Sequence, residues 1–159
     1  MSQVSPPIWR EVRIQTHEFN LGEEEPRIRQ YAHNAGALVA FQGMVREFDQ
    51  AQSLQALFLE HYEGVTEAEI ERIMDEAATR WPLLAAQVIH RVGLLHASEP
   101  IVLVQVCAEH RAEAFSAAQF IMDYLKTQAP FWKREHRTDG SEAWVAAKNS
   151  DQQASERWS

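Results

Sequence analysis

The chain has 159 residues, of which 45% are hydrophobic, and a formal net charge of −8 at pH 7. This length suffices for one well-buried core, so we expect a single domain over residues 1–159 with a polar tail at 150–159. The negative charge argues against a nucleic-acid-binding protein, because neutralising phosphates requires a basic face. No apolar run approaches the roughly 18 residues that cross a bilayer, and the first ten residues lack a signal pattern. A cytoplasmic protein is therefore expected.

The first part of the chain predicts a strand, a helix and a second strand. Alternating apolar and polar residues at 8–16 indicate a strand with one buried face. Residues 22–31 place glutamates ahead of arginines, the order that a helix dipole favours, so they predict a short helix. The apolar run at 36–45 predicts a buried strand that delivers Arg46 to the start of a loop.

A polar loop at 47–53 leads to a strand at 54–62 and then to a long helix. Thr66, followed three residues later by Glu69, matches a capping box. Apolar residues recur at helical spacing from there to Trp81, which precedes a proline. We therefore expect Thr66 and Glu69 to cap the start of this helix.

The second half of the chain predicts an antiparallel strand pair, another helix and a hairpin. These elements are strands at 86–95 and 100–108, a helix at 112–128, and hairpin strands at 133–137 and 142–145. Asp139 and Gly140 form a tight-turn dipeptide between the last two strands. Because strands and helices mix without regular alternation, the predicted class is α+β, with a mixed or antiparallel sheet and two main helices.

Two lysines lie on either side of a predicted helix end. Pro130 cannot continue a helix, so the helix that carries Lys126 should end near residue 129 and Lys133 should begin a new element. Lys126 falls at the edge of the apolar stripe of its helix, where partial desolvation would lower its pKa and suit it to proton transfer. The alternative is a lysine whose stem lies along apolar surface while its ammonium stays in water.

Cationic or protonatable groups recur where predicted elements end. Five such groups lie at these boundaries: Arg46, His110, Arg111, Lys126 and Lys133. Functional residues concentrate on loops held by a rigid scaffold, and the planar guanidinium of arginine binds phosphate or carboxylate through two hydrogen bonds. If the five groups converge, they predict a site for a small phosphorylated molecule. The alternative is that each arginine is an ordinary solvated surface charge.

Neither a metal site nor a cofactor is predicted. No two of the seven histidines lie at helical ligand spacing, and no glycine-rich phosphate loop is present. The single cysteine, Cys107, ends an apolar strand-like run, so we expect a buried structural residue. The alternative, a reactive thiol, would need an exposed and electropositive surrounding.

Several motifs together resemble the large, catalytic subunit of molybdopterin synthase. They are GMVR at 43–46, LEHY at 59–62, VIHRVG at 88–93, AEHR at 108–111, FIMDYLK at 120–126 and PFWKRE at 130–135. Trp144 and Val145 and the polar tail extend the similarity to the C-terminus. The resemblance therefore covers nearly the whole chain.

The resemblance implies a sulfurtransferase with an α/β-hammerhead fold. The implied reaction moves sulfur from the C-terminal Gly-Gly thiocarboxylate of a small ubiquitin-like subunit to cyclic pyranopterin monophosphate, forming the dithiolene of molybdopterin. The implied assembly is a homodimer of large subunits at the centre of a heterotetramer.

The resemblance also implies which residues form the site. Lys126 and Lys133 match the catalytic lysines. The implied substrate-binding residues are Met44, Val45, Arg46, His110, Arg111, Lys126, Lys133, Arg134, Glu135 and, from the neighbouring subunit, Lys148. All of them except Lys148 are expected to come from one chain. Where the family commonly has an arginine, Lys148 keeps the charge but loses the bidentate geometry.

A second function remains open at this stage. The chain could bind a ubiquitin-like partner or a phosphorylated pterin without catalysing a reaction, since binding needs the same basic pocket. The lysine pair distinguishes the two functions, because a phosphate-binding module could use arginine at either position whereas acid/base chemistry could not.

Overall fold

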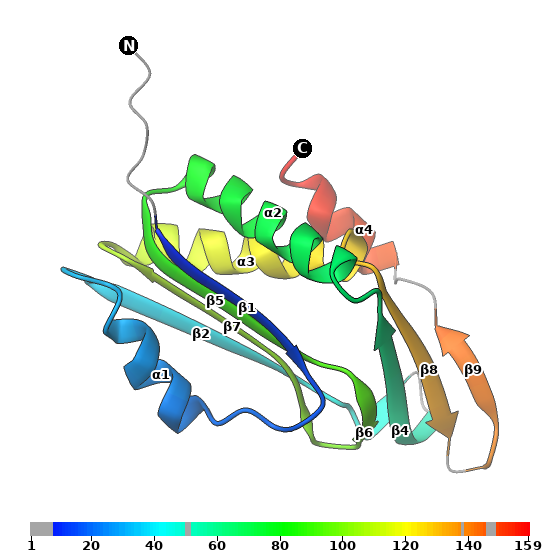
Figure 1. Cartoon of the computed structure of the whole chain (residues 1–159). Coiled ribbons are helices and arrows are strands. Elements are labelled where there is room, and N and C mark those ends of the chain that lie inside the picture. The colour runs from blue at the N-terminus through cyan, green and yellow to red at the C-terminus, as the bar shows by residue number, and fades with distance from the viewer. Residues whose placement is uncertain (1–7, 50–51, 138, 146–148) are drawn as a thin grey trace.

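The computed structural model describes residues 8–49, 52–137, 139–145 and 149–159. A four-stranded sheet lies between helices, and a second sheet extends from one end of it (Figure 1). The elements are β1 (Trp9–Gln15), α1 (Leu21–Arg29), β2 (Ala37–Met44), β3 (Phe48–Asp49), β4 (Gln52–His61), α2 (Val65–Arg80), β5 (Leu83–Arg91), β6 (Gly93–His96), β7 (Pro100–Ala108), α3 (Arg111–Thr127), β8 (Phe131–Arg137), β9 (Glu142–Val145) and α4 (Asn149–Glu156).

The first sheet has the strand order β1-β5-β7-β2 and holds the main core. β1 is parallel to β5, whereas β5 pairs antiparallel with β7 and β7 with β2. The helices α2 and α3 cover one face and α1 covers the other (Figure 1). Because both faces of the central strands are covered, β5 and β7 are almost continuously buried and read as apolar runs in the sequence.

The second sheet has the order β3-β4-β8-β9, with β6 paired to β4. The predicted single strand at 86–95 is wrong, since β5 belongs to the first sheet and β6 to the second. Gly93 causes the break: its φ of +88° lies in the left-handed region, which interrupts a strand and favours glycine. β3 was also not predicted, because residues 47–53 were expected to form only a loop.

The start of α2 differs from the predicted capping box. The helix begins at Val65, and the Glu67 side chain accepts a hydrogen bond from the Gly64 N–H at 3.1 Å. Glu69 instead pairs with Arg72 at 3.2 Å. The local spacing of Thr66 and Glu69 was therefore a misleading signal for this helix end.

The α+β class is confirmed by two sheets and helices that do not alternate regularly with strands. The strand pair β5 and β7 and the hairpin of β8 and β9 are also confirmed, with Gly140 at φ +88° in the hairpin turn. The helix α4 was not predicted, because its sequence is polar; Trp158, which follows it, packs against the core of α3. No helix in the described part of the chain is long and apolar enough to span a membrane.

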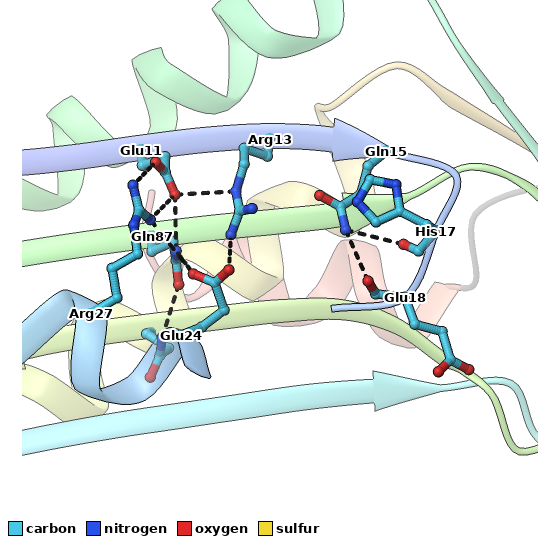
Figure 2. Close-up of polar contacts among 9 residues, drawn as sticks. Glu11, Arg13, Gln15, His17, Glu18, Glu24, Arg27 and Gln87 are labelled. Carbon is cyan, nitrogen blue, oxygen red and sulfur yellow. Dashed lines mark hydrogen bonds and ion pairs between the residues drawn. The ribbon is translucent and has the colours of Figure 1, made fainter. Parts of the chain in front are cut away.

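A partly buried polar network connects α1 to the first sheet (Figure 2). Both guanidinium Nη atoms of Arg27 donate to Glu11, at 2.7 and 2.6 Å. Gln87, which is fully buried, donates to Glu24 at 2.7 Å and to Glu11 at 2.9 Å, and Arg13 also donates to Glu24. The hydrogen bonds from Arg27 and Gln87 lower the pKa of Glu11 despite its burial. Burial alone would raise the pKa of Glu24, but the bonds from Arg13 and Gln87 lower it overall.

Acidification should weaken the fold through this network. Both carboxyl groups have folded-state pKa values below their ordinary 4.5, so they stabilise the fold above that pH and lose this contribution as the pH falls through the folded values. Urea unfolding from about pH 7 to about pH 3 should show a falling free energy of unfolding at the acidic end. The free energy of unfolding of the Glu24→Gln variant should fall less steeply over the same pH range. Parallel curves for the two proteins would show that the Glu24 carboxylate does not cause the acid sensitivity.

Candidate functional site

The two candidate catalytic lysines lie on consecutive elements, α3 and β8, on either side of Pro130. Lys126 is in the last turn of α3, and Lys133 is on β8. Lys133 is half-buried, whereas Lys126 is exposed. The predicted partial desolvation of Lys126 is therefore wrong for the single chain without a bound partner. Its position at the edge of the apolar stripe turns the side chain toward solvent rather than toward the sheet.

Lys133 shares one face of the second sheet with buried residues. In the antiparallel pair of β4 and β8, Lys133 lies opposite Leu59 and Glu135 lies opposite Leu57, so these four side chains point to the same side. Both leucines are buried, and Glu135 is only 4% exposed. Arg137 lies 3.4 Å from the Glu135 carboxylate and helps to compensate its charge. Lys133 thus projects from an apolar face next to a buried carboxylate.

The end of β2 reaches the same junction between the two sheets. Val45 is 2% exposed and packs in one apolar cluster with Leu57 and Leu59. The residues on either side, Met44 and Arg46, are exposed. Val45 therefore anchors this strand end beside the face that carries Lys133.

An uncharged histidine lies near both lysine-bearing elements. His90 on β5 stacks on Phe131, the first residue of β8, with ring centroids 3.9 Å apart. Its Nδ1 donates a hydrogen bond to the Arg91 carbonyl at 2.8 Å, because a carbonyl oxygen can only accept. Burial, together with the positive charges of Lys126 and His61, lowers the pKa of His90 to about 4. At neutral pH, therefore, His90 adds no positive charge beside Lys126.

Arg134 points away from this junction. Neighbouring residues on a strand project to opposite faces, so Arg134 lies on the other side of β8 from Lys133. Its guanidinium lies 5.3 Å from the ring centroid of Phe58, and its Nε lies 4.0 Å from a carboxylate oxygen of Glu142. Arg134 thus contributes to the outer face of the second sheet.

His110 and Arg111 lie at the far end of the first sheet. His110 precedes α3 and Arg111 begins it, and both are exposed. Lys126 lies 15 positions after Arg111 on one helix, a distance of about 22 Å along the axis at 1.5 Å per residue. The prediction that His110 and Arg111 converge with Arg46 and the two lysines within one chain is therefore wrong. Lys148, the remaining candidate, lies outside the described residues.

An open pocket of about 470 Å³ adjoins the junction, because its lining residue Val92 belongs to the same apolar cluster as Leu57 and Leu59. It is lined at the ends of β1, β4 and β5 and the start of α2, and its charged or protonatable lining residues are His17, His61, Glu63 and Glu67. Negative charge there disfavours an anion, so we do not assign the predicted anion site to this pocket. Within the described ranges, no three histidine, cysteine, aspartate or glutamate residues are grouped so as to hold a metal ion.

Comparisons with known proteins agree on one family. The model of the family described as MoaE protein matches residues 14–128. The "Molybdopterin synthase catalytic subunit" of Mesorhizobium japonicum is 52% identical over 99% of this chain and 97% of its own length. The protein of the same name from Escherichia coli K12 is 51% identical over 88% of this chain and 92% of its own. The "Molybdopterin biosynthesis MoaE protein" from Burkholderia ambifaria superimposes with a TM-score of 0.81 at 44% identity, covering 94% of this chain and 97% of that one.

Proposed function

This chain belongs to the MoaE protein family, and we propose on that basis that it is the catalytic subunit of a molybdopterin synthase. The proposed reaction transfers sulfur from the C-terminal thiocarboxylate of a small ubiquitin-like subunit to cyclic pyranopterin monophosphate, in the cytoplasm. The observation that carries the proposal is the near full-length identity to relatives named as this subunit. These relatives are named as catalytic subunits, which also supports the proposal that this chain acts together with a second, different chain.

Lys126 and Lys133 are the proposed catalytic residues, with Met44, Val45 and Arg46 beside them to bind substrate. Attack by the thiocarboxylate and release of the cyclic phosphate both develop negative charge, which fixed cations in a partly dry site stabilise strongly. A lysine can also transfer a proton if its surroundings adjust its pKa. The exposure of Lys126 leaves it accessible to a bound partner, which would then exclude water from it.

Lysine is rare in this chain compared with arginine, and this supports a specific chemical role for Lys126 and Lys133. Lysine occurs at three positions, Lys126, Lys133 and Lys148, and the other 12 of the 15 basic residues are arginines. Arginines make many of the ion pairs on the described surface, for example Arg10 with Asp75 and Arg29 with Glu25. Arginine cannot lose its proton in proteins, whereas lysine can, so lysine suits the two positions, Lys126 and Lys133, where proton transfer is proposed.

A symmetric dimer would unite the two separated groups of cations. β2 is an edge strand of the first sheet, and the exposed side chains of Phe41, Met44 and Phe115 lie along this edge and on α3. In an isologous dimer formed through this edge, the two copies of β2 would run in opposite directions. The start of β2 in one copy, beside His110 and Arg111, would then adjoin the end of β2 in the other.

Each proposed site therefore combines two chains. One chain would supply Arg46, Lys126 and Lys133, and its partner would supply a second His110 and Arg111. Lys148 is retained as a proposed contribution from the neighbouring subunit. This arrangement revises the division that the sequence predicted, in which Lys148 alone crossed between subunits.

A reconstituted reaction tests the proposed function. The purified protein would be mixed with cyclic pyranopterin monophosphate and a small partner that carries a C-terminal thiocarboxylate, and molybdopterin would be measured. Formation of molybdopterin that requires all three components is the expected result. Binding of the partner and the pterin without product would instead favour the non-catalytic binding module.

Cys107 should not take part in the sulfur transfer. It is fully buried on β7 beneath α1, and burial raises the pKa of its thiol to about 11, so it stays protonated at neutral pH. Cys107→Ala should leave turnover unchanged and lower the free energy of unfolding by about 1 kcal/mol. Activity assays and urea unfolding would check both. Detection of a persulfide on Cys107 during turnover, with loss of product in the alanine variant, would contradict this expectation.

A further inference from the structure

The turn at 128–130 sets the distance between the two lysines. Lys126 precedes it in the last turn of α3, and Lys133 follows it on β8. Backbone hydrogen bonds of 2.8 and 2.9 Å close the turn locally, and Pro130 has no N–H to add another. Both bonds stay within residues 124–131. The position of the turn relative to the two sheets therefore depends on contacts with other elements.

The hydroxyl of Thr66 makes such a contact from the first turn of α2. Its Oγ1 donates to the carbonyl of Pro130 at 3.0 Å, 64 residues away in the sequence. The same oxygen accepts a hydrogen bond from the N–H of Tyr62, also at 3.0 Å. The residue is fully buried. One hydroxyl group thus joins the end of β4 and the start of α2 to the turn between the lysines.

Two further contacts hold the same turn from other sides. Arg72 on α2 donates to the side chain of Gln128 at 2.7 Å, and the ring of His90 stacks on Phe131. The Arg72 contact is exposed and His90 is half-buried, whereas Thr66 is shielded from water. Loss of the Thr66 hydroxyl would leave two backbone groups without their partner where water cannot easily replace it, which makes it the costliest of the three to remove.

We propose that Thr66 is a positioning residue for the lysine pair: its buried hydroxyl holds Pro130 so that Lys126 and Lys133 keep the separation that the reaction needs. This inference rests on the proposed catalytic role of the two lysines. Thr66 itself does not touch the substrate in this proposal, and it acts through the turn alone.

Three substitutions at Thr66 separate the hydroxyl from the shape of the side chain. Thr66→Val keeps the shape and removes the hydroxyl, Thr66→Ser keeps the hydroxyl, and Thr66→Ala is a second variant without it. The hydroxyl-free variants should lower kcat by about 10- to 100-fold with little change in KM, since small misplacements of catalytic groups cost this much. Thr66→Ser should retain most of kcat. Thr79→Val is the matched control, because Thr79 lies on the same helix with an exposed hydroxyl that bonds locally to the Glu76 carbonyl at 2.7 Å.

A second readout does not require activity. With only three lysines in the chain, ¹³C-labelled lysine side chains give a small set of NMR signals that can be assigned by single substitutions. The signals of Lys126 and Lys133 should shift in Thr66→Val and Thr66→Ala, and they should stay in place in Thr66→Ser and Thr79→Val. Thermal unfolding of each variant would establish that it is folded at the assay temperature.

The outcomes are distinct. Wild-type kcat and unmoved lysine signals in a folded hydroxyl-free variant would overturn the proposal, as would an equal loss of kcat in Thr66→Ser. If the wild-type protein forms no molybdopterin, the proposed function fails. In that case shifted lysine signals would still support the role of Thr66 in placing the turn, and unmoved signals would refute it.

Discussion

Replacing Lys133 or Lys126 with alanine should lower the rate of molybdopterin formation by about 10²- to 10³-fold, the usual cost of removing one preorganised charge stabiliser. The fold should be preserved in both cases. Lys126 is exposed at a helix end, and Lys133 is a half-buried strand residue whose opposite neighbour, Leu59, stays in place. Steady-state rates in the reconstituted reaction, together with thermal unfolding, would check both expectations.

Two controls separate chemistry from charge. Arg29→Ala removes an exposed cation on α1, 59% exposed at its side chain, and should leave the rate unchanged. Arginine at position 126 or 133 keeps the charge but cannot give up a proton, so it should restore little activity. Near-wild-type rates in both alanine variants would show that the catalytic assignment is wrong. Full activity with arginine at both positions would favour a site that only binds the anion.

Secondary structure was predictable where the apolar period was clear. The near-continuous apolar run of β7 and the amphipathic pattern of α3 each predicted the right element within a few residues. The errors arose where backbone conformation or a distant contact decided the outcome. The positive φ of Gly93, at the start of β6, separates this strand from β5, and no periodicity reveals it. Thr66 bonds to Pro130 rather than capping its own helix.

The members of the candidate site were easier to predict than their arrangement. The sequence identified Arg46, Arg111 and the lysines because they lie at the ends of elements, but a linear pattern does not state which ends meet. The length of α3 separates two of these residues, because Arg111 and Lys126 lie at its two ends. His90 was missed altogether, because its importance depends on stacking against Phe131 from another sheet.

Mixing two inactive variants should restore activity if each site is shared between subunits. In the proposed dimer, one chain supplies Lys126 and the other supplies Arg111, so Lys126→Ala and Arg111→Ala should each abolish most turnover alone. A mixed dimer would contain one site that lacks both residues and one site that lacks neither. Random reassortment makes about half of the dimers mixed, so roughly a quarter of all sites should recover.

The control pairs Lys126→Ala with Lys133→Ala, which the proposal assigns to the same side of one site. Each site of that mixed dimer would still lack one lysine, so mixing should restore nothing. Subunit exchange would be verified by mass spectrometry of the mixed species before rates are compared. Recovery in the first mixture but not in the second requires that Arg111 act across the interface, because Lys126 lies 15 positions after Arg111 on one helix and the two are kept apart within one chain. Failure of the first mixture after verified exchange would mean that Arg111 serves its own subunit or lies outside the site.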